Sequence, residues 1–308
     1  MNYCLNTTKS YHAHELDTLG WELTVCNALY PENSPCRNIL KTNASLGVSL
    51  YRFLEKYIPF SESRNVLEIG GGIGYLLRDF LELNPNLRAT ALDISPYLLN
   101  RQKETLQKYN VRFIQADALK KETVFFTPFD LIIMNENMGD LPTLIPQKGI
   151  VPSPTEELLF YQNKASELNS RYYLNFASDE IINIGALMLL ENICRADVKY
   201  IYLSEHSCDA AVPEEMQKLI DIKPTATPEK ITLKGHDEYT IKFSQLQKIA
   251  EIFNYKVRRG PIADFLPIEF SNKLTAILRF RTPATDEQEI IQQFVYDLYK
   301  YEYLILTK

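Results

Sequence analysis

The sequence predicts an α/β fold in which helices cover both faces of a mainly parallel sheet. Short apolar runs rich in β-branched residues alternate with longer segments whose apolar residues recur at helical spacing. Parallel strands need crossover connections, usually helices, so this alternation is typical of a doubly wound sheet. In addition, four of the 11 glycines lie within residues 70–74, where the first strand should turn into the first helix.

The first half of the predicted sheet follows a regular rhythm. Strands are expected over residues 65–70, 88–93, 111–115 and 129–134, and helices over residues 75–83 and 95–109. Ser95 followed by Pro96 is a typical helix N-cap with proline at the first helical position. Each strand is therefore followed by a segment long enough to cross back over the sheet.

After residue 140 the alternation of strands and helices becomes less regular. Helices are expected from Ser153 to about Asn169, from Ser178 to about Cys194, from Ser244 and from Thr285, with strands at 199–203, 255–258 and 274–280 and a loop over 141–152. The predicted organisation is a helical cap over 1–64, a main domain over 65–281 with insertions at about 141–180 and 207–235, and a C-terminal helix over 282–308.

Composition excludes several classes of protein. The 308 residues carry a net charge of −6, which argues against a protein that binds nucleic acid through phosphate neutralisation. No apolar run reaches the ~18–20 residues of a membrane span. The N-terminal residues show no secretory signal, and the five cysteines are odd in number without C-x-x-C spacing. A reducing, cytoplasmic location is therefore expected.

The glycine cluster falls where a doubly wound sheet binds its ligands, in the crevice at the carboxyl ends of the strands. Glycine suits a tight turn there because a ligand can approach bare backbone. A dinucleotide site would follow G-x-G-x-x-G, but counting from Gly70 puts Tyr75 at the third glycine, and counting from Gly72 also fails. The pattern present is Glu68-x-Gly70-x-Gly72-x-Gly74.

This pattern is similar to motif I of the class I S-adenosylmethionine (SAM)-dependent methyltransferases. The resemblance implies a Rossmann-like sheet of about seven strands, with SAM as the cofactor. Asp93, 23 residues after Gly70, ends the second strand, where a carboxylate can accept hydrogen bonds from both ribose hydroxyls. Asp117 follows the third strand, where such enzymes commonly place an acid near the adenine amino group. Either aspartate could instead only cap a helix.

The residues expected to bind the cofactor are Glu68, Gly70, Gly72, Gly74, Asp93 and Asp117.

Two later segments carry a second resemblance. Residues 135–142 (NENMGDLP) and 235–246 (GHDEYTIKFSQL) look like the N-E-x-x-D-A-L-P and H-D-x-T-x-H-V-D-F-x-x-L segments of the MidA family, which includes the mitochondrial complex I assembly factor. The resemblance implies a class I methyltransferase that acts on protein arginine and takes part in respiratory-complex assembly. The chain differs from that family pattern at Ile73 and Lys242.

Three polar residues, Asn135, Glu136 and Asp140, follow the fourth strand and are expected to be catalytic. Methyl transfer is an in-line displacement at carbon, so catalysis needs mainly positioning and a base for the nucleophile. A pair of carboxylates can orient a guanidinium through bidentate hydrogen bonds, and can equally accept from an amine or a hydroxyl. The structural alternative is that Asp140 and Pro142 only shape a turn.

No metal site is expected from the sequence. The group Glu205, His206, Cys208 and Asp209 has metal-ligand chemistry, but its spacing fits no zinc pattern, so a pocket or capping role is expected. His12 and His14 form an H-x-H near the N-terminus and are also not expected to bind metal.

The predicted function is methyl transfer from SAM to a protein side chain or a small molecule, with nucleic acid an unlikely acceptor and no membrane association. Two alternatives remain open. One is another transfer on the same fold, such as aminopropyl transfer from decarboxylated SAM, in which the same carboxylates would hold a polyamine. The other is a non-enzymatic assembly protein that binds SAM. The oligomeric state does not follow from the sequence.

Overall fold

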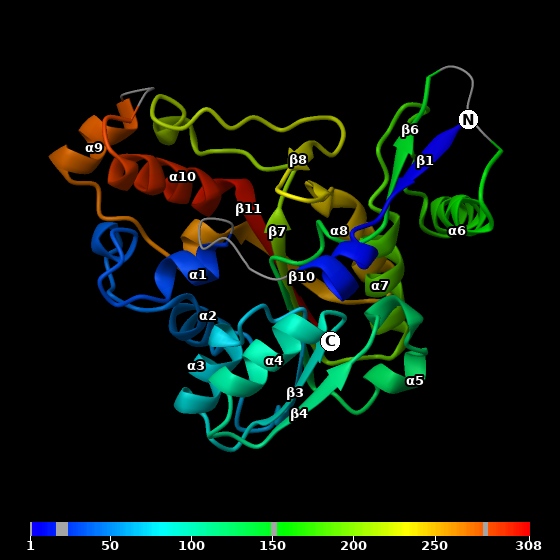
Figure 1. Ribbon diagram of the computed structural model, residues 1–308, viewed down its shortest axis with the longest axis horizontal. Helices are drawn as coiled ribbons and strands as arrows, with labels where there is room; N and C mark the ends of the chain where they lie inside the picture. Colours follow the sequence, from blue (N-terminus) through cyan, green and yellow to red (C-terminus); the bar gives the residue numbers. More distant parts are fainter. Residues whose placement is uncertain (1, 17–23, 149–152, 280–282) are drawn as a thin grey trace.

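The computed structural model describes residues 2–16, 24–148, 153–279 and 283–308. The strands of its main sheet are β2 (Asn65–Ile69), β3 (Arg88–Asp93), β4 (Val111–Gln115), β5 (Leu131–Asn135), β7 (Tyr200–His206), β10 (Lys256–Pro261) and β11 (Tyr301–Thr307). Within these described ranges, seven strands form one sheet in the order β10-β11-β7-β5-β2-β3-β4. Only β11 runs antiparallel to both of its neighbours. The predicted α/β sheet of about seven strands is confirmed (Figure 1).

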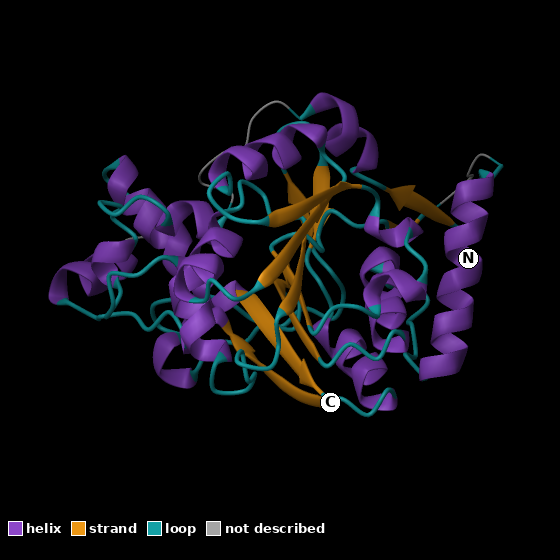
Figure 2. Ribbon diagram, turned by 90° about the horizontal axis from the view of Figure 1, so that it is seen from below, coloured by secondary structure: helices purple, strands orange, loops and turns teal. Residues whose placement is uncertain are grey.

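Helices cover both faces of the sheet, which Figure 2 shows edge-on between them. Their bounds are α1 (Val25–Leu29), α2 (Leu46–Leu54), α3 (Tyr75–Leu83), α4 (Pro96–Thr105), α5 (Thr123–Phe126), α6 (Glu156–Tyr172), α7 (Ile184–Arg195), α8 (Phe243–Ile252), α9 (Asn272–Arg279) and α10 (Asp286–Lys300). One apolar core lies under α1, α2, α3, α9 and α10, and the other under α5, α6, α7 and α8.

The strands supply both cores by alternation. In β5, Leu131 and Ile133 belong to the first core, while Ile132 and Met134 belong to the second. Because successive side chains point to opposite faces, a strand buried on both sides is apolar throughout. This explains why the buried central strands were recognisable in the sequence.

The predicted strand at 274–280 is wrong. Residues Asn272–Arg279 form α9, with Leu274 and Ile277 buried on one face at helical spacing. Phe280, the last residue of the predicted strand, lies outside the described residues. The seventh strand is instead β11, so the predicted C-terminal helix ends at Lys300 and the chain returns into the sheet between β7 and β10.

The predicted loop over 141–152 also contains a strand. Residues Thr143–Pro146 form β6, which pairs antiparallel with β1 (Tyr3–Asn6) near the N-terminus. The segment over 1–64 is therefore not only helical. Strands of four residues are too short for alternation to reveal them. Residues 17–23 and 149–152, within these two segments, lie outside the described residues.

Three helices begin at residues other than those predicted. The N-cap of α6 is Thr155 rather than Ser153, because the Thr155 side chain accepts a hydrogen bond from the Leu158 amide. The α7 helix begins at Ile184, not near Ser178, because residues 178–179 form a turn and Ile182 pairs with Leu144 in an isolated bridge. The α8 helix begins at Phe243, one residue before the predicted Ser244 cap.

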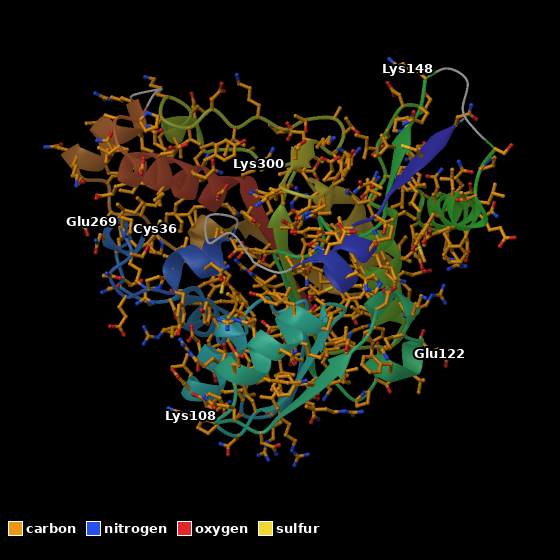
Figure 3. The ribbon with its side chains drawn as sticks, viewed as in Figure 1. Cys36, Lys108, Glu122, Lys148, Glu269 and Lys300 are labelled. Carbon is orange, nitrogen blue, oxygen red and sulfur yellow. The ribbon has the colours of Figure 1, made fainter. Side chains whose placement is uncertain are left out.

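The segment over 207–235 contacts the end of α10. Lys300, which is labelled in Figure 3, is almost fully buried there. Its Nζ forms an ion pair with a Glu229 carboxylate oxygen. The same segment leads into a short hairpin of β8 (Lys230–Thr232) and β9 (Asp237–Tyr239). Among the helices described in the structure, none is both long and apolar enough to cross a membrane.

Candidate active site

The glycine-rich turn connects β2 to α3 at the carboxyl edge of the sheet. Gly70, Gly72 and Gly74 have φ of 64°, 54° and 87°, a backbone region that favours glycine. A Cβ on Gly72 would meet no described atom within 4 Å, whereas one on Gly70 would lie 2.6 Å from Nδ2 of Asn137. The backbone at Gly72 is therefore open to a ligand.

Gly74 has a different environment from Gly72. It is the N-cap of α3, and its Cβ would lie 3.4 Å from Gln102 and from Leu106, beside α4. The cavity at the turn is lined by Gly70, Gly71 and Gly72 but not by Gly74. The left-handed conformation at Gly74 thus serves helix packing.

Glu68 lies beneath the turn and is fully buried. A Cβ on Gly71 would lie 2.3 Å from Glu68 Oε2, so Gly71, which sequence reasoning did not single out, must also lack a side chain. Oε2 of Glu68 has no hydrogen-bond partner among the residues described. Burial, and secondarily the charge of Asp93, raises the pKa of Glu68 to about 8. This is an unsatisfied carboxyl beside the glycine turn.

Asp93 ends β3 and is linked to the glycine turn through Gln102. Its carboxylate accepts hydrogen bonds from the Ser95 amide at 2.9 Å and from Gln102 Nε2 at 2.8 Å. Gln102 Nε2 also donates to the Gly72 carbonyl at 3.1 Å. Burial raises the pKa of Asp93 to about 6, and the two hydrogen bonds partly offset that rise. Asp93 therefore has a structural role, and its contact with the ribose stays a prediction.

Asp117 follows β4 and has two partners. It caps a short 3₁₀ turn by accepting from the Leu119 amide, and its other carboxylate oxygen lies 3.0 Å from Lys9 Nζ. Asp117 therefore caps a helical turn, which was the alternative to binding the adenine. The contact with Lys9 also places the N-terminal segment over this end of the sheet.

Asn135 is the last residue of β5, and Glu136 follows it; their side chains contact each other. Asn135 Nδ2 donates to Glu136 Oε1 at 2.9 Å. The Glu136 carboxylate also accepts from the amides of Val25 and Cys26, at 2.7 and 3.2 Å, and so caps α1. Burial raises the pKa of Glu136, while these donors oppose the rise. Glu136 has a left-handed φ of 56°, uncommon for this residue type.

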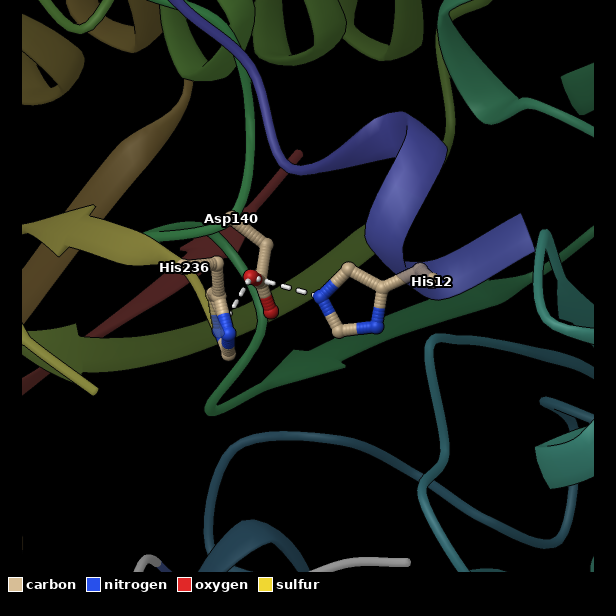
Figure 4. Close-up of side chains that lie close together, drawn as sticks. All are labelled: His12, Asp140 and His236. Carbon is tan, nitrogen blue, oxygen red and sulfur yellow. Dashed lines mark hydrogen bonds and ion pairs between the residues drawn. The ribbon is translucent and has the colours of Figure 1, made fainter. Parts of the chain in front are cut away.

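Asp140 lies farther along the same loop and binds two histidines. Its Oδ1 lies 2.7 Å from His12 Nε2 and 3.5 Å from His236 Nε2 (Figure 4). Burial alone would raise the pKa of Asp140, but the hydrogen bonds from the two histidines hold it below its usual range. The structure therefore brings together residues of both segments, 135–142 and 235–246, that carry the second resemblance.

Glu205, near the end of β7, supports the Asp140 loop. Its Oε2 accepts from the amides of Met138 and Gly139, at 3.0 and 3.2 Å, and burial raises its pKa to about 8. Asp209 accepts from the Ser244 amide. Asp209 therefore caps the first turn of α8, whereas Glu205 holds the turn at Met138 and Gly139.

The cavity at the glycine turn measures about 50 Å³ and is lined by Glu68, Gly70, Gly71, Gly72, Ile73, Tyr75, Leu76, Asn135, Glu136, Thr24, Cys26 and Asn27. Ligand pockets usually enclose ~300–1,000 Å³. The cavity at the glycine turn is much smaller, and α1 narrows it. A cavity of about 670 Å³ lies at the opposite edge of the sheet, near the start of β2 and β3. Doubly wound sheets bind ligands at the carboxyl edge, so we assign the site to the smaller cavity.

Sequence reasoning missed the residues that α1 contributes. Tyr30, just after α1, stacks on Tyr75 with ring centroids 3.4 Å apart, and the Arg78 guanidinium lies 4.8 Å from the Tyr30 ring. Thr24, Cys26 and Asn27 also line the cavity. A helix of five residues has no periodic signal that would have placed it over the turn.

Comparisons with known proteins agree with this fold. Residues 67–147 match a family model described as a methyltransferase domain. Malonyl-[acyl-carrier protein] O-methyltransferases from Acetivibrio thermocellus and Anoxybacillus flavithermus are 34% and 33% identical over 76 and 72 residues, which is 24% and 23% of this chain. These alignments span only about a quarter of either relative (26% and 27%).

A solved structure of an uncharacterised protein from Burkholderia thailandensis extends the fold comparison to almost the whole chain. It superposes with a TM-score of 0.52 and 13% identity, and the alignment covers 94% of this chain and 87% of the other. At that identity the likeness concerns the fold. The sheet order, the glycine turn and the matched segment together show that the chain carries a methyltransferase domain of the class I, SAM-dependent type.

Proposed function

We propose that this chain is a SAM-dependent methyltransferase whose cofactor binds on the Gly70–Gly72 backbone. The observation that carries the proposal is the open left-handed turn at Gly72, next to the buried Glu68 carboxyl without a partner. Both lie in the segment that matches the methyltransferase model. SAM, when bound, would supply an activated methyl group. Asp93 and Asp117 would then hold the ribose and the adenine.

The residues after β5 are the proposed acceptor side of the site. The Asn135 side chain lines the cavity beside Glu136 and accepts from the Ser204 hydroxyl at 2.8 Å, which fixes its orientation. Glu136 is partly buried, and its carboxylate is positioned to hold or accept a proton at the cavity. By this proposal Asn135 and Glu136 position the nucleophile, and Asp140 supports the loop from its far end.

The acceptor is proposed as a protein side chain or a small molecule. Support for arginine comes from the resemblance of residues 135–142 and 235–246 to the MidA family, together with the carboxylates of Glu136 and Glu205 near this edge. The malonyl-[acyl-carrier protein] relatives act on a different acceptor by name, and they match only the cofactor part. Transfer of a labelled methyl group from SAM into lysate protein or small-molecule fractions tests the proposal. Absence of label from both would contradict it.

Glu136→Gln separates a catalytic role from a capping role. Glutamine keeps an acceptor oxygen for α1 but cannot take a proton, so we expect SAM binding to persist and the rate of methyl transfer to fall by about 10²-fold or more. Thr24→Val is the matched control, because Thr24 caps the same helix through the Asn27 amide. Equal loss of transfer in both variants would show that Glu136 acts only by holding α1.

A further inference from the structure

Three potential metal ligands from distant parts of the chain meet at one point. His12 lies in a single π-helical turn (Tyr11–Glu15), Asp140 in the loop after β5, and His236 in the hairpin between β8 and β9. One ligand atom of each, a histidine nitrogen or a carboxylate oxygen, lies within 4.8 Å of the others. Figure 4 shows both imidazole rings directed at the Asp140 carboxylate.

We propose that His12, Asp140 and His236 bind a divalent transition-metal ion, with zinc as the best match. Two imidazoles and one carboxylate are a frequent ligand set for such ions. Around a tetrahedral zinc ion, ligand atoms lie about 3.3 Å from one another. The distances from Asp140 Oδ1 to the two Nε2 atoms, 2.7 and 3.5 Å, lie on either side of that value. Small side-chain shifts would therefore form the coordination sphere.

The arrangement suits a metal better than a pair of hydrogen bonds. Both Nε2 atoms face the same carboxylate oxygen, and the two rings are only 5.4 Å apart between centroids. If both rings were imidazolium ions, their positive charges would repel each other, and if both were neutral Nε2–H tautomers, both would have to donate to one carboxylate oxygen. A metal ion would replace both protons and leave the two imidazoles neutral.

The surroundings hold the ligands in place and shield them from water. The His12 and His236 side chains are only 13% and 10% exposed. The Tyr11 ring stacks on His236 with centroids 4.3 Å apart, and the Thr8 hydroxyl donates to the Asp140 carbonyl at 2.8 Å. Nδ1 of His236 is buried and finds no partner in the described part of the chain. Local hydrogen bonding therefore leaves this imidazole incompletely satisfied.

Glu238 lies next to the three proposed ligands, with its Oε1 3.0 Å from His236 Nε2. The Asp140 carboxylate also interacts electrostatically with Asp93, so the proposed metal lies on the same carboxyl edge as the glycine turn. The metal proposal itself does not depend on methyl transfer, because its tests measure metal binding and ligand identity.

Zinc titration of the full, chelator-treated chain by calorimetry tests the proposal. We expect one ion per chain, and binding at least about tenfold weaker in His12→Ala and in His236→Ala, because each variant loses a ligand. His14→Ala is the matched control, since His14 belongs to the same turn but is exposed. Its affinity for zinc should equal that of the wild type. Absence of stoichiometric binding, or equal loss in the His14 variant, would overturn the proposal.

X-ray absorption at the zinc edge adds a readout that misfolding cannot imitate. The wild type should show two imidazole ligands. His12→Ala and His236→Ala should each show one imidazole ligand if they retain zinc. Circular dichroism of the metal-free variants confirms that they fold. Two imidazoles in all three proteins, or sulfur ligands in the wild type, would contradict the assignment. SAM titration of the same samples reports on the cofactor site separately.

Discussion

Glu68→Gln should make the ligand-free protein more stable at pH 8 and should weaken its binding of SAM. The pKa of Glu68 is raised from an ordinary 4.5 to about 8 in the folded state. At a pH between these two values, Glu68 is ionised in the unfolded chain but protonated in the folded protein. Folding therefore loses stability as the pH rises from about 4.5 to about 8. Glutamine does not ionise, so this loss should disappear in the variant.

The measurement is denaturant unfolding of both proteins at pH 5 and pH 8. The gain from Glu68→Gln should be small at pH 5 and on the order of 2 kcal/mol or more at pH 8. Glu205→Gln is the control, because that buried carboxyl also has a pKa of about 8 but does not line the cavity at the glycine turn. It should change the pH dependence of stability without lowering SAM affinity. Identical pH profiles for wild type and Glu68→Gln would refute the buried-acid account.

Gly185→Ala should destabilise the protein, although alanine usually favours a helix. In the interior of a helix this substitution normally gains up to about 1 kcal/mol. Here the added Cβ of α7 would lie 2.6 Å from Pro142 Cδ and 2.8 Å from Leu141 Cβ. The Gly185 amide also donates to the Pro142 carbonyl at 2.8 Å, so the helix cannot simply withdraw. We expect a net loss of about 1–3 kcal/mol.

Thermal or denaturant unfolding checks this prediction. Ser166→Ala in α6 is the control, because Ser166 is exposed and a methyl group there meets no such obstacle. Its stability should be unchanged or slightly higher. Since Asp140 immediately precedes the displaced Leu141, Gly185→Ala should also disturb the loop that carries Asp140. A Gly185 variant as stable as the wild type would mean that the loop and α7 are less tightly packed than the structure shows.

The elements that could be predicted from sequence share long or clearly periodic patterns. The strand β5 is an apolar run up to its last residue, β2, β3 and β4 follow it in the same alternation with helices, and Ser95 with Pro96 marked the start of α4. The strand β11 was missed because its apolar run directly continues the amphipathic pattern of α10. Only its place between β7 and β10, which is a tertiary fact, decides that it is extended. The strands β1 and β6 were missed because each is short and forms a strand by pairing with the other.

The site could be predicted only where its residues follow the strands in sequence. Glu68, the glycines, Asp93 and Asp117 belong to that class. The contacts of the N-terminal segment do not, because Lys9 and His12 meet partners 108 and 128 residues away. The H-x-H at His12 and His14 did not match a zinc-binding pattern in the sequence. The other proposed ligands, Asp140 and His236, come from distant loops that only folding brings close to His12.

Calorimetric titration with SAM, using two matched glycine variants, tests whether the cofactor binds on the Gly72 backbone. Gly72→Ala and Gly74→Ala both place a side chain at positive φ, so both should lose about 1–2 kcal/mol of stability. Only the methyl group at position 72 would enter the open space at the turn. We expect one SAM per chain for the wild type and for Gly74→Ala, and at least about tenfold weaker binding for Gly72→Ala. No heat of binding in the wild type, or equal affinity in all three proteins, would contradict this expectation.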